Sequence, residues 1–144
     1  MIVDSSAIMS VLLGEPDSLD MAGALSIAPR RAISAGNWIE LAAVITRRKN
    51  AALEAAFDAF IRTTILTIEP VTVAQAQIGH DAYKFYGHGS GHVADLNFGD
   101  CFAYALAKAT GEPLLFKGND FSKTDVTPAL KPPPPPADAA PADR

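Results

Sequence analysis

The sequence predicts an α/β domain in which a short, mostly parallel sheet is covered by helices on both faces. Two observations predict this class. Short apolar segments with the character of strands alternate along the chain with longer segments of helical periodicity. The strand segments are apolar along most of their length rather than at every second residue, which is typical of strands buried on both faces. With 144 residues, 49% of them hydrophobic, the chain is long enough to bury one core without disulfides.

The first half of the chain is predicted to form two strands and four helices. The run Met1–Asp4 is apolar until its final acid, and it predicts a buried first strand. Ser5 or Ser6 then caps a helix over 7–13 that Gly14 ends. The other elements of this half are a helix from the turn 15–17 to about residue 27, a strand at 32–34, a helix from the cap Asn37 to about 47, and a helix over 51–62 capped by Asn50.

The second half is predicted to add two strands and two helices. The β-branched run 64–68 predicts the third strand, and the capping box Thr72-x-x-Gln75 opens a helix to about residue 85. A glycine-rich loop follows, and Asn97 caps a helix that Gly111 ends. The fourth strand is 113–116. The predicted domain therefore spans 1–128, and the proline- and alanine-rich segment 129–144 is expected to be an extended or disordered tail.

Composition limits the classes of function. The N-terminal segment has no basic region, no apolar run reaches the length of a membrane span, and Cys101 is the only cysteine. We therefore expect a cytoplasmic protein that does not enter a membrane. The net charge of −4 argues against gripping nucleic acid by bulk electrostatics. It does not exclude nucleic-acid chemistry, because divalent metal ions in a carboxylate cluster supply positive charge locally.

Four acids are predicted to gather at one edge of the sheet. Asp4 closes the first strand and Asp120 follows the fourth, and ligands of open parallel sheets bind beyond the carboxyl ends of the strands. Glu40 and Asp100 each lie three residues after an asparagine, in what we predict to be the first turn of a helix that begins at the same edge. Such a cluster of oxygen ligands favours Mg²⁺ or Mn²⁺.

Each acid also has an ordinary structural interpretation. Glu40 and Asp100, taken singly, are explained by the preference of helix starts for negative charge. Asp4 is explained less easily, because an acid at the end of a buried strand is costly without a partner. The chain contains no P-loop, no dinucleotide-binding glycine motif, no paired cysteines and no nucleophile elbow.

Four segments resemble the VapC-type ribonucleases of the PIN-domain family, which are toxins of type II toxin–antitoxin systems. They are Met1-Ile-Val-Asp4-Ser5-Ser6-Ala7-Ile8, Ile33-Ser34-Ala35 leading to Glu40-Leu41, Leu96-Asn97-Phe98-Gly99-Asp100-Cys101, and Pro113 to Phe121. The resemblance covers about residues 1–127. It implies a PIN-like three-layer α/β/α domain with a central sheet of four to five strands.

The resemblance also implies a mechanism and partners. Asp4, Glu40, Asp100 and Asp120 would be the catalytic acids and would bind Mg²⁺ or Mn²⁺ for hydrolysis of an RNA phosphodiester, in tRNA or rRNA for many relatives. Ser6, and Asn119 beside the last acid, would support the site. The expected partners are a cognate VapB-type antitoxin and a second copy of the chain in a homodimer.

One position departs from the family pattern. Many relatives carry an acid two residues before the last one, whereas this chain has Gly118 there, followed by Asn119. Two alternatives to a toxin therefore stay open at the level of sequence. One is a PIN-like module that binds RNA or a partner with weakened catalysis. The other is a PIN nuclease of RNA processing that is not a toxin.

Overall fold

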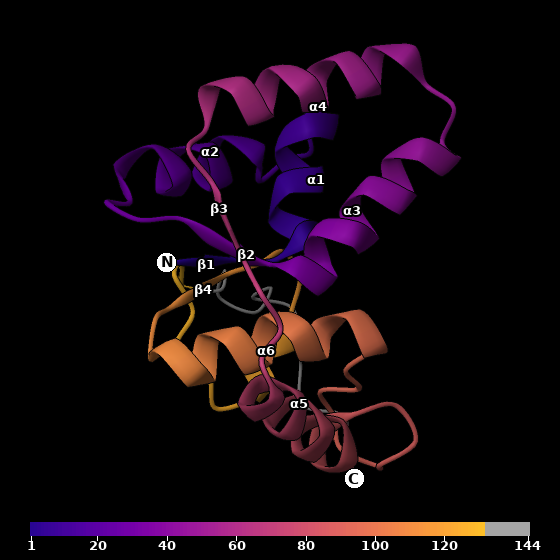
Figure 1. Cartoon of the computed structure of the whole chain (residues 1–144), viewed down its shortest axis with the longest axis vertical. Coiled ribbons are helices and arrows are strands. Elements are labelled where there is room, and N and C mark those ends of the chain that lie inside the picture. Colours follow the sequence, from indigo (N-terminus) through magenta and orange to yellow (C-terminus); the bar gives the residue numbers. More distant parts are fainter. Residues whose placement is uncertain (132–144) are drawn as a thin grey trace, which may run out of the picture.

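A computed structural model describes residues 1–131, and the rest of the predicted tail, residues 132–144, lies outside the described part. The described residues form four strands, six α-helices and one short 3-10 helix (Figure 1). In chain order these are β1 (Ile2–Val3), α1 (Ser5–Leu13), α2 (Ser18–Ile27), β2 (Ala32–Ser34), α3 (Ala35–Arg47), α4 (Ala51–Thr63), β3 (Thr67–Glu69), α5 (Val73–Tyr86), α6 (Phe98–Thr110), β4 (Leu114–Leu115) and η1 (Phe121–Lys123).

The four strands form one sheet in the order β3-β2-β1-β4, and every neighbouring pair is parallel. Ile2 of β1 lies opposite Ala32 of β2 on one side and Leu114 of β4 on the other. The predicted α/β class and parallel sheet are confirmed. The topology places β1 between β2 and β4, so whatever follows β1 occupies the middle of the carboxyl edge.

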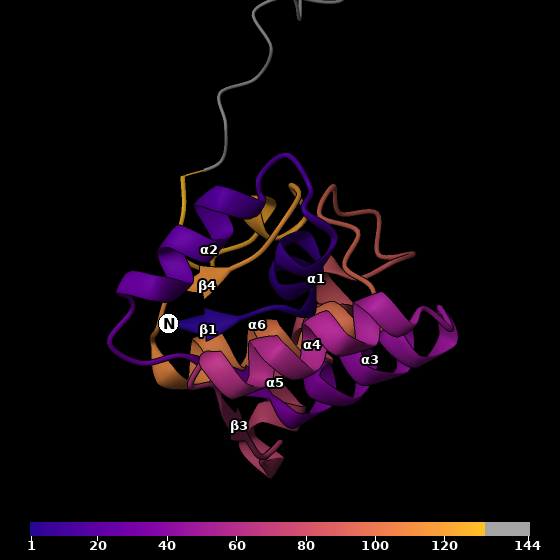
Figure 2. The ribbon, with the colours of Figure 1, turned by 90° about the horizontal axis from the view of Figure 1, so that it is seen from above.

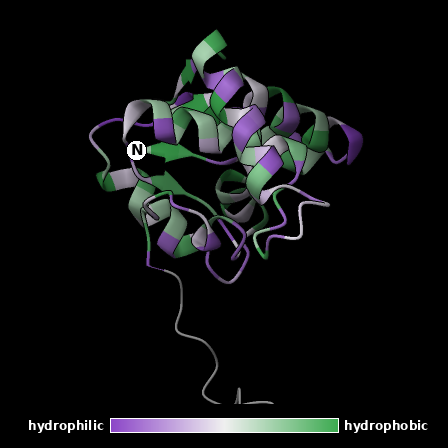
Figure 3. Ribbon diagram, turned by 90° about the horizontal axis from the view of Figure 1, so that it is seen from below, coloured by the Kyte–Doolittle hydropathy of each residue, from purple (hydrophilic) through white to green (hydrophobic). Residues whose placement is uncertain are grey.

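Helices cover both faces of the sheet, which gives the three layers expected from the sequence. Figure 1 shows α1 to α4 on one side and α5 with α6 on the other. Successive residues of β1 point to opposite faces. Ile2 belongs to the core that includes residues of α5 and α6, and Val3 to the core that includes residues of α1 to α4. The central strands β1 and β4 are correspondingly hydrophobic (Figure 3), and they lie side by side in the sheet (Figure 2).

Two helices start earlier than predicted, because a residue at or directly after the end of the preceding strand caps each helix. Asp4, rather than Ser5 or Ser6, caps α1. Ser34 caps α3 by accepting a hydrogen bond from the Gly36 amide at 3.3 Å. The prediction that Asn37 caps this helix is wrong, since Asn37 lies within its first turn. Glu40 therefore sits in the second turn of α3.

The third strand is also displaced from its prediction. The β-branched run 64–68 predicted it, whereas β3 forms at Thr67–Glu69. The pairing with β2 explains this, because Ala32 lies opposite Thr67 and Ser34 opposite Glu69. Residue 64 instead ends α4, where its amide donates to the Phe60 carbonyl at 2.8 Å.

The described chain makes core contacts slightly beyond the predicted domain end at residue 128. Pro128 forms a parallel bridge with Leu114, and the Ala129 amide donates to the Leu114 carbonyl at 2.8 Å. Ala129 and Leu130 pack against the core that contains Val3. The segment after β4 thus returns across the sheet edge before the described part ends.

The helices of residues 1–131 are all short. The longest, α5, has 14 residues, and none is long and apolar enough to cross a lipid bilayer.

Candidate metal site

Asp4 lies in the middle of the carboxyl edge, between the ends of β2 and β4. Its side chain is buried, at 3% exposure, and its Oδ2 accepts a hydrogen bond from the Ser6 amide at 3.0 Å as it caps α1. Burial, and to a smaller extent the charge of Glu40, raises the pKa of Asp4 to about 6, against hydrogen bonds from Ser6 that lower it. The carboxylate is thus held firmly but has no cationic partner among residues 1–131.

Asp100 lies in the first turn of α6, as predicted, and forms a capping box with the predicted cap Asn97. The Asn97 side chain accepts from the Asp100 amide, and Asp100 Oδ2 accepts from the Asn97 amide, both at 2.9 Å. Burial raises the pKa of Asp100 to about 7, and the charges of Asp4, Asp120 and Glu40 add to that rise. The four predicted acids therefore interact through space, as carboxylates that approach one another from four segments must do.

Glu40 is held by contacts from two other helices. Its Oε1 accepts a hydrogen bond from the Ser5 hydroxyl at 2.6 Å. Its other oxygen lies over the backbone of Gly99, where an added Cβ would stand 1.7 Å from Oε2. Only glycine at position 99 leaves room for this carboxylate next to Asp100.

Asp120 is the most exposed of the four acids. It precedes η1 and makes no side-chain capping hydrogen bond there, so its carboxylate is free of local partners. The loop before it is tied to α1, because the Lys117 amide donates to the Ser6 hydroxyl at 3.0 Å. Gly118 has φ +89°, in the left-handed region that favours glycine. An acid at this position would be strained in this backbone conformation.

The two predicted supporting residues have different surroundings. The Ser6 hydroxyl lies within the site, between Asp4 and the loop after β4. Asn119 is exposed, and its carbonyl accepts from the Ser122 hydroxyl at 2.6 Å. Ser6 therefore has the more direct contact with the acid cluster.

Asn37 is a site residue that sequence reasoning missed. Its side chain is fully buried, and its Nδ2 donates to the Gly99 carbonyl at 2.9 Å, while its Oδ1 has no partner among the described residues. This bond ties the first turn of α3 to the first turn of α6. The motif Asn37-x-x-Glu40 marked the residue as important, but a capping sequence gave no sign of a partner 62 residues away.

Hydrogen bonds join the four acid-bearing segments in a series. Asn37 connects α6 to α3 through Gly99, Ser5 connects α3 to α1 through Glu40, and Ser6 connects α1 to the loop after β4. Each bond involves an acid or a residue within three positions of one. The relative positions of the acids are therefore fixed by hydrogen bonds between these segments as well as by the sheet.

The donor set fits a hard divalent cation. Four carboxylates and a hydroxyl are the ligands that Mg²⁺ and Mn²⁺ prefer, and the neighbouring Cys101 is buried with its thiol directed to the Asn97 carbonyl. Among residues 1–131 no three ligating side chains converge into a finished metal cage. Glu40 and Asp100 each direct an oxygen to a local hydrogen-bond donor. The raised pKa values of Asp4 and Asp100 mark the uncompensated charge that a cation would balance.

The comparisons with known proteins agree with this arrangement. Residues 1–126 match the family described as PIN domain. The chain is 45% identical over 130 residues to ribonuclease VapC28 and 43% identical over 129 residues to ribonuclease VapC42, both of Mycobacterium tuberculosis. Each match covers 90% of this chain and 98% of the relative. Ribonuclease VapC of Mycolicibacterium smegmatis is 40% identical over 126 residues, with 88% and 97% covered.

Solved structures share the fold at low sequence identity. Mycobacterium tuberculosis VapC20, described as a toxin that cleaves the sarcin-ricin loop, superposes with a TM-score of 0.67 at 20% identity, covering 91% of this chain and 98% of that one. A toxin–antitoxin complex from Klebsiella pneumoniae gives a TM-score of 0.61 at 18% identity, with 84% and 89% covered.

Proposed function

The chain belongs to the PIN-domain family, and we propose that it is a VapC-type endoribonuclease, the toxin of a toxin–antitoxin pair. The observation that supports the proposal is the placement of Asp4, Glu40, Asp100 and Asp120 at one edge of the sheet, where burial and, to a smaller extent, the charges of neighbouring acids raise the pKa values of Asp4 and Asp100. Buried acids placed in this way without cationic partners destabilise a fold, so their presence favours a role in chemistry.

We propose that Asp4, Glu40 and Asp100 hold Mg²⁺ or Mn²⁺ and that Asp120 completes the set from the exposed side. A divalent ion bound there supplies Lewis-acid chemistry and positive charge for attack of water on an RNA phosphodiester. Asp4 is the most rigid of these ligands because it is buried and caps α1. Asp120 is the most accessible, which suits an acid that contacts the substrate side of the site.

The residues around the acids keep them oriented. The Ser5 hydroxyl holds Glu40 in place, and Asn97 holds Asp100 through the capping box. Ser6 accepts from the Lys117 amide, so its own hydroxyl proton is available for a carboxylate or a water molecule. Asn119 supports the site from the exposed loop beside Asp120. No histidine or lysine is required as a base.

Cleavage of RNA by purified protein with added Mg²⁺ or Mn²⁺ tests the proposal. Asp4→Asn and Asp100→Asn keep the hydrogen-bond acceptors of both helix caps and remove the charges. We expect the cleavage rate of each to fall by roughly a hundredfold or more, the scale of losing one electrostatic catalytic group. Asp58→Asn, an exposed acid of α4, is the matched control and should cleave at the parental rate. Equal cleavage by Asp100→Asn and the parent protein would show that the site is assigned wrongly.

We also propose two protein partners. The first is a VapB-type antitoxin, whose co-expression from an adjacent gene should restore growth that the toxin arrests. The second is another copy of the chain. An apolar cavity of about 400 Å³ between α5 and α6 is bordered by Phe98, whose side chain is 75% exposed, and this uncovered surface supports a homodimer. Light scattering should give twice the chain mass of 15.1 kDa.

A further inference from the structure

The end of α3 carries the densest group of unpaired positive charge in the described part of the chain. Arg47, Arg48 and Lys49 are consecutive and exposed, and none forms an ion pair with an acid of residues 1–131. Several other cations are neutralised, since Arg30 pairs with Glu69 and Glu112, Lys108 with Asp125, and Lys117 with Glu15. In a chain of net charge −4, this group is a local exception.

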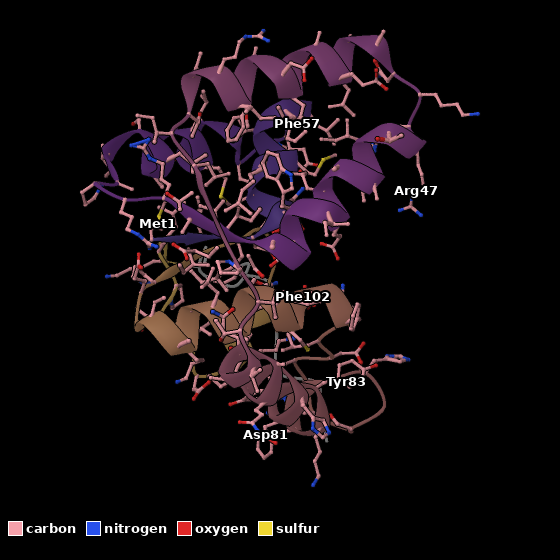
Figure 4. The ribbon with its side chains drawn as sticks, viewed as in Figure 1. Met1, Arg47, Phe57, Asp81, Tyr83 and Phe102 are labelled. Atoms are coloured by element: carbon pink, nitrogen blue, oxygen red, sulfur yellow. The ribbon has the colours of Figure 1, made fainter. Side chains whose placement is uncertain are left out.

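The helical register connects this group to the acid cluster. Arg47 follows Glu40 by seven residues, which is close to two full turns, so both lie on the same face of α3 about 10 Å apart along its axis. Between them on this face are Ala43 and Val44, which carry no charge. In Figure 4 the Arg47 side chain extends from the end of α3 on the side where α6 and Phe102 lie. This face of α3 therefore leads from the acids to the cations without a negative charge between them.

A polyanionic substrate needs such a surface. The acid cluster repels phosphate wherever no metal ion lies, and the net charge of the protein gives no general attraction for RNA. Phosphate contacts made by arginine hold a strand in place without reading its sequence. Arg47 lies two helical turns from Glu40, and no charged side chain lies between them on this face of α3. It is therefore in a position to bind a phosphate that flanks the cleaved bond.

We propose that the end of α3, Arg47 to Lys49, binds backbone phosphates of the RNA, so that the strand runs along α3 from the acid cluster. This inference rests on the proposed ribonuclease function. The competing explanation is that these cations only stabilise the carboxyl end of α3 through its macrodipole. The two explanations differ in what they predict for the salt dependence of RNA binding.

The test measures binding of a fluorescent single-stranded RNA to the non-cleaving Asp100→Asn protein over a range of salt concentrations. The double variant Arg47→Gln/Arg48→Gln is compared with Arg62→Gln/Lys84→Gln, which removes two exposed cations from α4 and α5. Each lost contact with a single-strand phosphate reduces the slope of log K against log salt by about 0.7, so two lost contacts reduce it by about 1.4. We expect this reduction, with an affinity loss of about tenfold at low salt, only for the α3 pair.

Four results would overturn the proposal. One is an equal loss of slope in both double variants, which would indicate a general effect of net charge. Another is a lower melting temperature of the α3 variant with unchanged RNA binding, which would indicate the macrodipole role. If the parent protein binds and cleaves RNA while the α3 variant binds unchanged, this proposal alone fails. If the parent neither binds nor cleaves RNA, the proposed function fails and this proposal falls with it.

Discussion

Asp100→Asn should lower the cleavage rate by roughly a hundredfold or more and yet stabilise the metal-free protein at neutral and alkaline pH. The physical reason is the raised pKa of Asp100, about 7 against its usual value of 3.8. A carboxyl group whose pKa is raised this far lowers the stability of the fold by roughly 4 kcal/mol once it is ionised, because each pKa unit corresponds to about 1.4 kcal/mol. Because Asp100 is half-buried, solvent screening lowers this cost to about 2 kcal/mol.

The substitution removes this cost, but it also removes one favourable interaction of the charged carboxylate. The neutral amide still accepts from the Asn97 amide, but it gives up the attraction between a negative charge and the start of α6, about 0.5 kcal/mol. The net stabilisation expected for Asp100→Asn is therefore about 1 to 2 kcal/mol at about pH 8. This is large enough to measure by urea denaturation.

The sign of the pH dependence follows from proton linkage. Between about pH 4 and pH 7 the folded protein keeps the Asp100 proton that the unfolded chain has released, so its stability falls as the pH rises through this range. Above about pH 7 both states are ionised and the loss is complete. The stability gap between Asp100→Asn and the parent should thus be small near pH 5 and reach its full size near pH 8.

Urea denaturation in EDTA, followed by circular dichroism at the two pH values, measures this gap. Added Mg²⁺ or Mn²⁺ should then stabilise the parent more than the variant, because only the parent keeps the full set of ligands. A gap of the same size at both pH values would refute the reasoning, as would an Asp100→Asn protein that is less stable than the parent near pH 8. Either result would mean that Asp100 carries no uncompensated charge.

Three further substitutions test how the site is held. Gly99→Ala should lower the cleavage rate and the metal affinity at least tenfold, because its Cβ displaces the Glu40 carboxylate, and it should cost little stability. Calorimetric titration with Mg²⁺ measures the loss of metal affinity separately from the loss of cleavage. Asn37→Ala should cost about 1 to 3 kcal/mol in urea denaturation by leaving the Gly99 carbonyl buried without a donor, and should weaken metal binding as well. Leu41→Ala, on the fully buried face of α3, should cost about 2 to 5 kcal/mol and leave the metal affinity of the folded fraction unchanged.

The sequence allowed prediction of the features that depend on local pattern and on topology. The apolar run ending at Asp4, the helix cap Asn97 and the glycine stops at Gly14 and Gly111 are local signals, and the structure confirms each of them. The convergence of Asp4 and Asp120 followed from the rule that parallel strands end at one edge. These features require no knowledge of a distant contact.

The features that could not be predicted depend on competition between local signals or on contacts far apart in the chain. Ser34 and Asn37 are both acceptable caps for α3, and the choice of Ser34 goes with burial of Asn37 against α6. The position of β3 follows from its pairing with β2 rather than from its own β-branched residues. The space that Gly99 leaves for Glu40 depends on how closely α3 approaches α6, which no local pattern encodes.

The way each acid is held explains how the metal-free fold tolerates the cluster. Asp4 and Asp100 lie at the starts of α1 and α6, where backbone amides donate to them and the helix dipoles offset part of their charge. Glu40 has no such help, since it lies in the second turn of α3. Its position depends on the Ser5 hydroxyl and on the room above Gly99. Substitutions that leave all four acids intact should therefore act on the site chiefly through Glu40.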